Sequence, residues 1–219
     1  MIKLPKKIKI CGFDIKVIFP YRFIDVDYEG CFGKYENIIK IEGKDRAENI
    51  IIPEREVLAT LMHEIVHAID YTYCDGHLSN YDNYEDDIDR LAVGMSQILF
   101  ENDLYLRNRQ LSIPPRLNII GFNVKVTFPY DFKEGSLQSS FNTALSEIRI
   151  AKRKYDDIFS PPYLKYLLIH NLVAAVSSYL RLPHRDNNNG VLKSLGIAFH
   201  QVIMDNKLDI LYRRVGKKL

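Results

Sequence analysis

The N-terminal segment of the chain alternates between apolar and other residues with a period of two. Four apolar residues at alternate positions would point to the same side of an extended strand, which is typical of a strand with one buried face. These positions are Phe13, Ile15, Val17 and Phe19. The pair Cys11-Gly12 just before them predicts the turn of a hairpin, and a second strand pair is expected near residues 30–35 and 37–42.

The period of the apolar positions changes to that of a helix from about residue 54 to about residue 73. Apolar residues in this stretch recur three and four positions apart, so they share one face of a helix. They are Leu58, Leu61, Met62, Ile65 and Ile69. A polar loop follows, and Asn83 is a suitable N-cap for a second helix because Asp86 lies three residues further on.

The same pattern recurs in the second half of the chain. Residues 5–23 match residues 114–132 at a constant offset of 109, and the register continues without a gap beyond them. It extends to the pairs Phe32/Phe141, Ile39/Ile148 and Ile41/Ile150. Coincidence does not explain so long a register, so the sequence predicts an internal duplication.

The duplication predicts two closely packed modules, at about residues 1–110 and 111–219. Their junction falls at residues 107–110, where no flexible Gly/Ser linker is found. Each module would carry two pairs of strands followed by two helices, an α+β arrangement with a small antiparallel or mixed sheet. A chain of 219 residues, of which 47% are hydrophobic, can bury one large core or two small ones.

Net charge and cysteine content limit the partners and the location that we expect. A net charge of +2 is too small to indicate a nucleic-acid partner, and the basic residues 213–218 are expected to form a solvated tail. No signal peptide and no run of 18 apolar residues is found, so neither export nor a membrane partner is expected. Three widely spaced cysteines without a CxxC pair, Cys11, Cys31 and Cys74, indicate reduced thiols in the cytoplasm.

The helix expected over residues 54–73 contains the sequence H-E-x-x-H, formed by His63, Glu64 and His67. Residues four apart project from the same face of a helix, so the two imidazoles can bind one zinc ion. Glu64 lies one position further round, where its carboxylate can reach a water on the metal without binding the metal itself. Because the apolar stripe is centred on the opposite side, this face can point into a cleft. Two surface histidines on an amphipathic helix are the alternative interpretation.

A catalytic zinc site needs a third protein ligand and keeps a fourth position for water. Glu85, near the start of the second expected helix, is the candidate for this ligand. Asp89 shares its face four residues later and is expected to fix a histidine ring, and Asp70 is expected to support the two histidines. Acidic residues also gather in the first turn of helices because they oppose the helix dipole, which explains Asp86 and Asp87 well.

Other side chains near the motif are further candidates with less support. His77 lies ten residues after His67, too far for the longer motif whose third histidine follows after six. Asp75 is a further acidic candidate. Tyr71, Tyr73 or His77 could donate a hydrogen bond to a developing oxyanion, although each is also a suitable packing or loop residue.

Two segments of the first half carry a resemblance to a known family. They are residues 61–70, with the H-E-x-x-H motif, and residues 85–92, in which Glu85 is followed by Ile88, Asp89 and an apolar pair. In these segments the chain resembles the ImmA/IrrE family of gluzincin metallopeptidases, including its small phage-encoded members. The resemblance implies a zincin-like module, a zinc ion held by the two histidines and Glu85, and a family Asn/Asp position at Asp89. Ile88 departs from the small residue usual in that motif.

The second half keeps the pattern of the fold and loses the candidate ligands. The H-E-x-x-H motif corresponds there to His170, Asn171 and Ala174, so one histidine remains. The region of Glu85 falls near the asparagines 187–189. A lone histidine cannot hold a zinc ion, and His170 is expected to be buried and hydrogen-bonded.

These observations predict a zinc-dependent endopeptidase that binds one zinc ion per chain and acts in the cytoplasm, or in the host cytoplasm if a phage encodes it. Glu64 would act as general base, and a protein or peptide substrate would lie as an added strand beside residues 37–42. The degenerate second copy would serve structure or recognition. The alternative is a regulatory, protein-binding pseudo-dimer, possessing bound zinc but little hydrolytic activity. A chain with two paired modules could remain a monomer.

Overall fold

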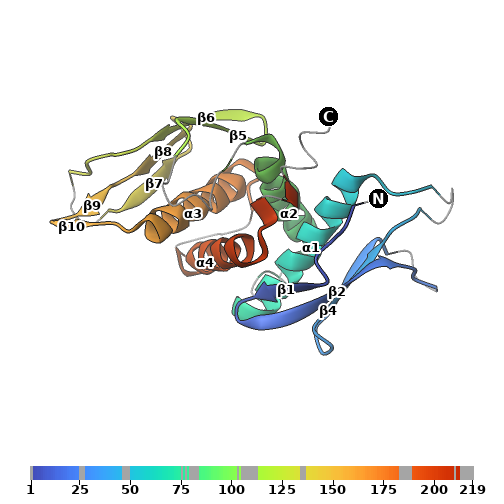
Figure 1. Ribbon diagram of the computed structural model, residues 1–219. Coiled ribbons are helices and arrows are strands. Elements are labelled where there is room, and N and C mark those ends of the chain that lie inside the picture. The colour runs from blue at the N-terminus through green and yellow to red at the C-terminus, as the bar shows by residue number, and fades with distance from the viewer. Residues whose placement is uncertain are drawn as a thin grey trace.

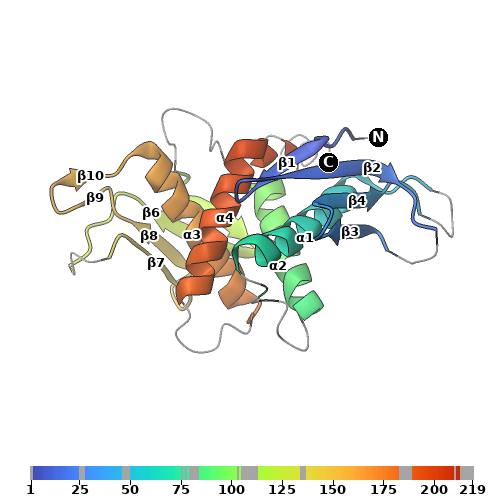
Figure 2. The same cartoon turned by 90° about the horizontal axis from the view of Figure 1, so that it is seen from below.

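The computed structural model describes residues 2–24, 28–45, 50–74, 76, 78, 84–102, 104, 113–133, 137–182, 189–209 and 211–212. In this part of the chain, four helices lie between two small sheets, with one sheet at each end of the molecule (Figure 1). The view from below shows the same arrangement, with the helices in the middle (Figure 2). The fold is therefore α+β, as the sequence predicts.

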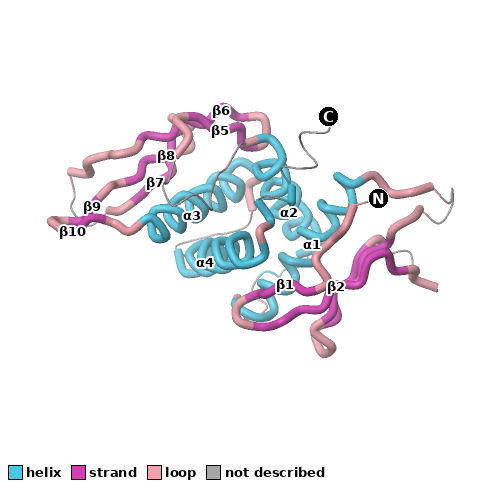
Figure 3. Tube along the Cα trace, viewed as in Figure 1, coloured by secondary structure: helices cyan, strands magenta, loops and turns pink. Residues whose placement is uncertain are grey.

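Each half contributes a four-stranded sheet and two long helices (Figure 3). The elements of the first half are β1 (Lys7–Ile10), β2 (Phe13–Tyr21), β3 (Gly30–Gly33), β4 (Ile38–Glu42), α1 (Glu54–Tyr73) and α2 (Tyr84–Glu101). Those of the second half are β5 (Arg116–Ile119), β6 (Phe122–Thr127), β7 (Ser139–Asn142), β8 (Glu147–Ile150), α3 (Pro161–Tyr179) and α4 (Asn189–Asn206). A short ribbon that the sequence analysis did not anticipate, β9 (Arg153–Lys154) with β10 (Asp157–Ile158), precedes α3. None of the described helices combines the length and the apolar character needed to cross a bilayer.

The two four-stranded sheets have the same strand order, β1-β2-β4-β3 in the first half and β5-β6-β8-β7 in the second. In each sheet the outer pairs are antiparallel, and the central pair, β2 with β4 or β6 with β8, is parallel. The parallel pairing places β4 and β8 inside their sheets. It leaves β3 and β7 as terminal strands of the sheets in the described part of the chain.

The periodicities seen in the sequence correspond to buried faces. Ile15 and Val17 of β2 are buried, whereas Phe13 at the start of the strand is 52% exposed. The helical stripe expected on α1 is fully buried. Buried apolar residues of both halves belong to one continuous cluster, so the halves share a core. The expected junction at 107–110 and the basic residues 213–218 lie outside the described residues.

Two equivalent asparagine contacts join the halves, each made by two hydrogen bonds. At the end of α2, the Asn102 side chain accepts a hydrogen bond from the backbone N–H of Asn118 in β5 (2.8 Å) and donates one to its carbonyl (2.7 Å). At the end of α4, the Asn206 side chain does the same with the N–H and carbonyl of Lys9 in β1, at 2.7 and 2.8 Å. Each amide thus pairs with the outer side of a terminal strand in the opposite half.

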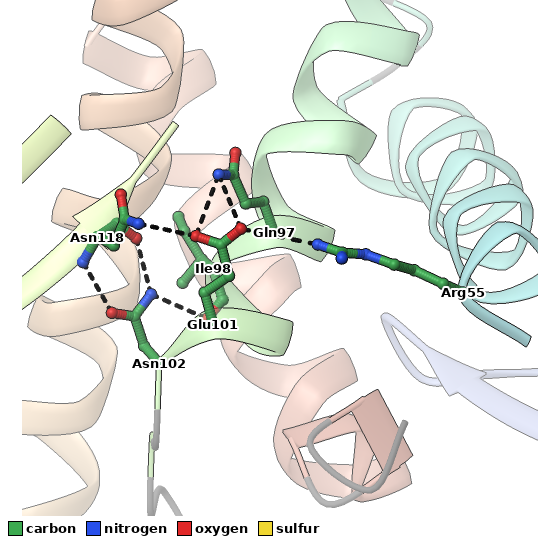
Figure 4. A network of polar contacts seen from close by, with 6 residues as sticks. All are labelled: Arg55, Gln97, Ile98, Glu101, Asn102 and Asn118. Atoms are coloured by element: carbon green, nitrogen blue, oxygen red, sulfur yellow. Dashed lines mark hydrogen bonds and ion pairs between the residues drawn. The ribbon is translucent and has the colours of Figure 1, made fainter. Parts of the chain in front are cut away.

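Further polar contacts surround the contact between Asn102 and Asn118 (Figure 4). The carboxylate of Glu101 accepts hydrogen bonds from Gln97 (3.0 and 3.1 Å) and from the side chain of Asn118 (2.9 Å). Arg55, at the start of α1, forms a 3.6 Å ion pair with Glu101. A buried hydrogen bond also joins α1 to Tyr212, near the end of the chain: the Tyr212 hydroxyl donates to the carbonyl of Leu58 (2.5 Å). The Tyr212 hydrogen bond thus joins α1 directly to the second half.

Candidate metal centre

The two histidines of the H-E-x-x-H motif lie on the partly exposed side of α1. The core side of this helix carries Leu61, Met62 and Ile65, which are fully buried. His63 and His67 are one helical turn apart on the other side, and each side chain keeps 20% of its surface exposed. The apolar burial that anchors α1 therefore also turns both imidazoles toward solvent.

Glu85, in the first turn of α2, completes a group of three side chains able to hold a metal ion. Its Oε2 atom lies 3.5 Å from Nε2 of His63 and 3.3 Å from Nε2 of His67, and the two Nε2 atoms are 2.8 Å apart. Ligand atoms about 2.0–2.1 Å from a tetrahedral zinc ion are separated by about 3.3 Å. Two of the three separations match this value, and the third would lengthen by about 0.5 Å, so the His₂Glu donor set fits zinc.

A hydrogen bond to His63 and the lowered pKa of His67 suit a role as metal ligands. The Oδ1 atom of Asp89 lies 2.6 Å from Nδ1 of His63. In the tautomer that satisfies this contact, Nδ1–H donates to the carboxylate and Nε2 keeps a lone pair facing Glu85. Burial, together with the neighbouring charge of His63, lowers the pKa of His67. A neutral His67 ring can therefore also offer a lone pair at neutral pH.

Asp70 has a more specific contact than the sequence analysis assigned to it. It is fully buried, and its Oδ1 atom accepts a hydrogen bond from the backbone N–H of Leu78 at 2.8 Å. The Asp70 backbone carbonyl accepts a second hydrogen bond from the N–H of Gly76 at 2.9 Å. Asp70 therefore fixes the segment that follows α1, on the side of the helix where the cleft begins.

Glu64 lies beside the ligands but is turned into the protein. Its exposed fraction is only 4%, and the backbone N–H of Phe32 in β3 donates a hydrogen bond to it. The strand comes so close that a Cβ atom at Gly30 would lie 2.6 Å from the Oε1 atom of Glu64. Burial, helped by the charges of Glu85 and Asp89, raises the pKa of Glu64 to about 8 against the effect of the Phe32 N–H. Such a carboxyl group can take up and return a proton near neutral pH.

A cleft of about 620 Å³ opens in front of these groups, between β3, α1 and the start of α2. Tyr71, one of the expected oxyanion donors, lines this cleft. Tyr73 is 42% exposed and is not one of the lining residues. His77 and Asp75, which the sequence analysis also considered, lie outside the described residues.

Two lining residues were missed by the sequence analysis, Tyr28 and Tyr84. The ring of Tyr84 lies 6.4 Å from that of His67, measured between centroids. Its position directly before Glu85 at the start of α2 was the signal that could have indicated it. Tyr28 precedes β3 and carries no such signal, because only the folded sheet brings it to the cleft.

The strand that borders the cleft is β3, and the expectation that a substrate would add beside residues 37–42 is wrong. Most of that segment is β4, which pairs with β2 on one side and with β3 on the other. The N–H of Glu42 donates to the carbonyl of Glu29, so the alternation of an antiparallel pair turns the backbone groups of Gly30 and Phe32 away from β4. The accessible edge at this cleft is therefore β3.

The corresponding place in the second half holds a different set of side chains. Asn171, the counterpart of Glu64, is 2% exposed and donates a 2.7 Å hydrogen bond to the carbonyl of Leu167. His170 is half-buried rather than buried, and it has a hydrogen bond with the backbone of Leu192. Lys193 occupies the position of Asp89 when the two terminal helices are aligned on their shared asparagines, Asn102 and Asn206. The described residues of this half contain no group of three potential metal ligands.

The geometry thus distinguishes one site, at the meeting point of α1, α2 and β3, where two histidines and two glutamates converge on a cleft. Comparisons of the chain with models of protein families, with curated proteins and with solved structures find no match.

Proposed function

We propose that the protein is a zinc-dependent peptidase with one zinc ion per chain, held by His63, His67 and Glu85. The observation that carries the proposal is the convergence of Nε2, Nε2 and Oε2 atoms from two helices at the mouth of a cleft. A structural zinc site is usually closed by four protein ligands, whereas three ligands beside a cleft are typical of a catalytic site. The buried carboxyl group of Glu64 next to these ligands supports hydrolysis.

We further infer that a zincin-like module was duplicated, giving residues 1–110 and 111–219. The constant offset of 109 and the shared strand order support this inference. The turn geometry supports it as well, because Cys11 and Ile120 have φ of 49° and 52°, and Gly12 and Gly121 have φ of 90° and 77°. A positive φ is unfavourable for a β-branched residue such as Ile120, so inheritance of the turn explains it better than local preference does.

The residues of the site divide the work of peptide hydrolysis between them. When bound, zinc would supply a Lewis acid that polarises the scissile carbonyl and makes water a stronger nucleophile. Glu64 would accept the proton from the attacking water and pass it to the leaving amine. Asp89 would hold the ring of His63 in place, and Tyr71 or Tyr84 would face the substrate.

A substrate would dock in an extended conformation along β3. The backbone groups of Gly30 and the carbonyl of Phe32 point to the accessible edge, which is the arrangement used when a peptide adds a strand to a sheet, while the N–H of Phe32 is bound to Glu64. The missing side chain at Gly30 lets β3 itself lie close to Glu64 and Thr60. Binding along this edge would place a carbonyl of the peptide in front of the candidate ligands.

The proposal is tested by metal analysis of the purified protein and by the Glu64→Gln variant. We expect about one zinc per chain in both proteins, and a loss of cleavage by a factor of about 10²–10⁴ in the variant because the general base is gone. Glu36→Gln, an exposed glutamate in the turn between β3 and β4, is the matched control and should cleave normally. Equal cleavage of a casein substrate by wild type and Glu64→Gln would refute the role of Glu64.

A second candidate function is a zinc-containing, protein-binding pseudo-dimer with little hydrolytic activity. The feature that favours it is the second half, which retains the sheet and both helices without a ligand triad in its described residues. The same experiment separates the two functions. One zinc per chain, without any cleavage that depends on Glu64, would support the binding function instead.

A further inference from the structure

The second half contains its own cleft, in the position that corresponds to the metal centre. It lies between β7, α3 and α4, as the first cleft lies between β3, α1 and α2, and its volume is about 960 Å³. Counterparts line both clefts: Ser139 takes the place of Gly30, and His170 that of His63. The loss of the ligand triad has therefore left the second cleft open, and its volume exceeds that of the first.

One wall of this second cleft is aromatic. The rings of Tyr163 and Tyr166 are 5.7 Å apart, and the ring of Tyr166 lies 5.9 Å from that of His170 and 6.3 Å from that of His200. These four residues line the cleft together with the apolar side chains of Leu167, Ala174, Leu192 and Ile197. The wall can therefore contact apolar side chains of a ligand.

The charged groups that line the two clefts differ. Glu64 and Glu85 line the first cleft, whereas no aspartate or glutamate is among the described residues that line the second. Lys193 lines the second cleft and is exposed, at the position that Asp89 occupies in the first half. Burial lowers the pKa of His170 and that of His200, so Lys193 supplies the positive charge here at neutral pH.

The strand that borders this cleft presents an accessible edge. β7 is the terminal strand of its sheet, and the N–H of Ala151 donates to the carbonyl of Gln138. Because hydrogen-bonded pairs alternate along an antiparallel ladder, the backbone groups of Ser139 and Phe141 point away from β8. An extended peptide can pair with these groups and direct alternate side chains into the cleft.

We propose that the second cleft is a peptide-binding site, which takes an extended segment that pairs with β7, carries both acidic and apolar residues on the face it turns to the cleft, and brings a carboxylate to Lys193. The apolar side chains of the segment lie against the wall of Tyr163 and Tyr166. This site does not depend on the proposed function, because it contains none of the candidate metal ligands. Its role is to hold a protein partner, whether or not that partner is cleaved in the first cleft.

Fluorescence anisotropy tests the proposal with a labelled, end-capped octapeptide of sequence Glu-Ser-Val-Ser-Glu-Ser-Val-Ser, the Glu-Val probe, in which Glu and Val share one face of the strand. We expect the full chain to bind this probe at least about tenfold more tightly than the corresponding Lys-Val peptide, and to bind it more weakly as salt is added. Lys193→Glu should weaken binding about tenfold or more, and because this side chain is exposed the variant should fold normally. The matched control is Lys152→Glu, which reverses an exposed lysine that lines neither cleft and should leave the affinity unchanged.

A second pair of variants tests the strand edge. Ser139→Pro removes a backbone N–H that points away from β8, so it should weaken binding of the Glu-Val probe, whereas Ser139→Ala keeps the N–H and should bind normally. Equal affinity for the Glu-Val and Lys-Val probes, or unchanged affinity in Lys193→Glu, would overturn the proposal. Self-association of the wild-type chain in sedimentation, lost in Lys193→Glu, would also overturn it, because a second copy would then be the occupant of the cleft.

Discussion

The two halves of this protein have the same strand order and differ most where their chemistry would lie. In the first half, a polar face of α1 meets the acidic first turn of α2, and two histidines converge with Glu85. In the second half the equivalent face carries His170, Asn171 and Ala174. The sheet and the helices depend on apolar periodicity, whereas the candidate site depends on a few polar positions. The comparison therefore shows that, among the described residues, the same strand order occurs with and without such a group of side chains.

The largest expected effect comes from removing a candidate ligand in one half and its counterpart in the other. His63→Ala leaves two ligand side chains, so we expect bound zinc to fall from about one per chain to near zero, with loss of any zinc-dependent cleavage. His170→Ala, the counterpart, should keep a full complement of zinc. Metal analysis after gel filtration measures both. Zinc that is retained in His63→Ala and lost in His170→Ala would show that the metal binds in the second half and would contradict the proposed site.

The next effect concerns the carboxylate that orients the ring of His63. Asp89→Asn weakens the 2.6 Å hydrogen bond to Nδ1, and loss of such a contact lowers metal affinity by about 10–100-fold. Asp86→Asn removes an exposed carboxylate from the same helical turn and should change the affinity far less. Competition with a zinc chelator measures the two affinities. An equal loss in both variants would indicate that general negative charge, and not the contact with His63, matters.

Variants of the two asparagines that join the halves, Asn102 and Asn206, test whether the two contacts stabilise the protein equally. Asn102→Ala and Asn206→Ala each remove two hydrogen bonds to a terminal strand of the opposite half, so each should lower the free energy of unfolding by about 1–3 kcal/mol. Urea denaturation measures these losses. Asn142→Ala removes a hydrogen bond confined to a turn, to the N–H of Leu145, and should cost less. A large loss of unfolding free energy in only one of these two asparagine variants would show that the two contacts are not equivalent.

The smallest effect is a pH dependence confined to the second sheet. A hydrogen bond from Thr127, acting against burial and together with Lys125 and Arg149, lowers the pKa of Glu147 from 4.5 to about 2. The stability that this carboxylate contributes is therefore complete above about pH 4.5 and is lost as the pH falls toward 2. The first half has Ile38 at the equivalent position and lacks this dependence.

Urea denaturation of wild type and Glu147→Gln between pH 7 and pH 2.5 measures this contribution. The difference in stability between the two proteins should be largest near pH 7 and should shrink below about pH 4.5, where Glu147 binds a proton in the unfolded wild type but not yet in the folded protein. Glu36→Gln, with an exposed carboxylate and a 3.7 Å ion pair to Lys40, should follow the wild-type profile closely. A difference that grows toward low pH would contradict the assignment.

The local pattern of the sequence predicted the longer elements, although not the β9–β10 ribbon, and it named three side chains that the structure brings together. The bounds of α1 follow from its apolar stripe, because a helix can bury one face only if apolar residues recur every three or four positions. The same rule places His63 and His67 on the opposite side. Glu85 could be found from the sequence because it lies in the first turn of the next helix.

Only the tertiary structure decided which strand borders the cleft, how Glu64 is buried and how the halves are joined. The parallel pairing of β2 with β4 puts β3 at the edge, and it joins segments whose pairing no local periodicity encodes. The close approach of Gly30 to Glu64 and the reach of Asn102 and Asn206 into opposite halves likewise join residues far apart in the chain. Periodicity reports which face of an element is buried, whereas the partner of that face is selected by the packing of the whole molecule.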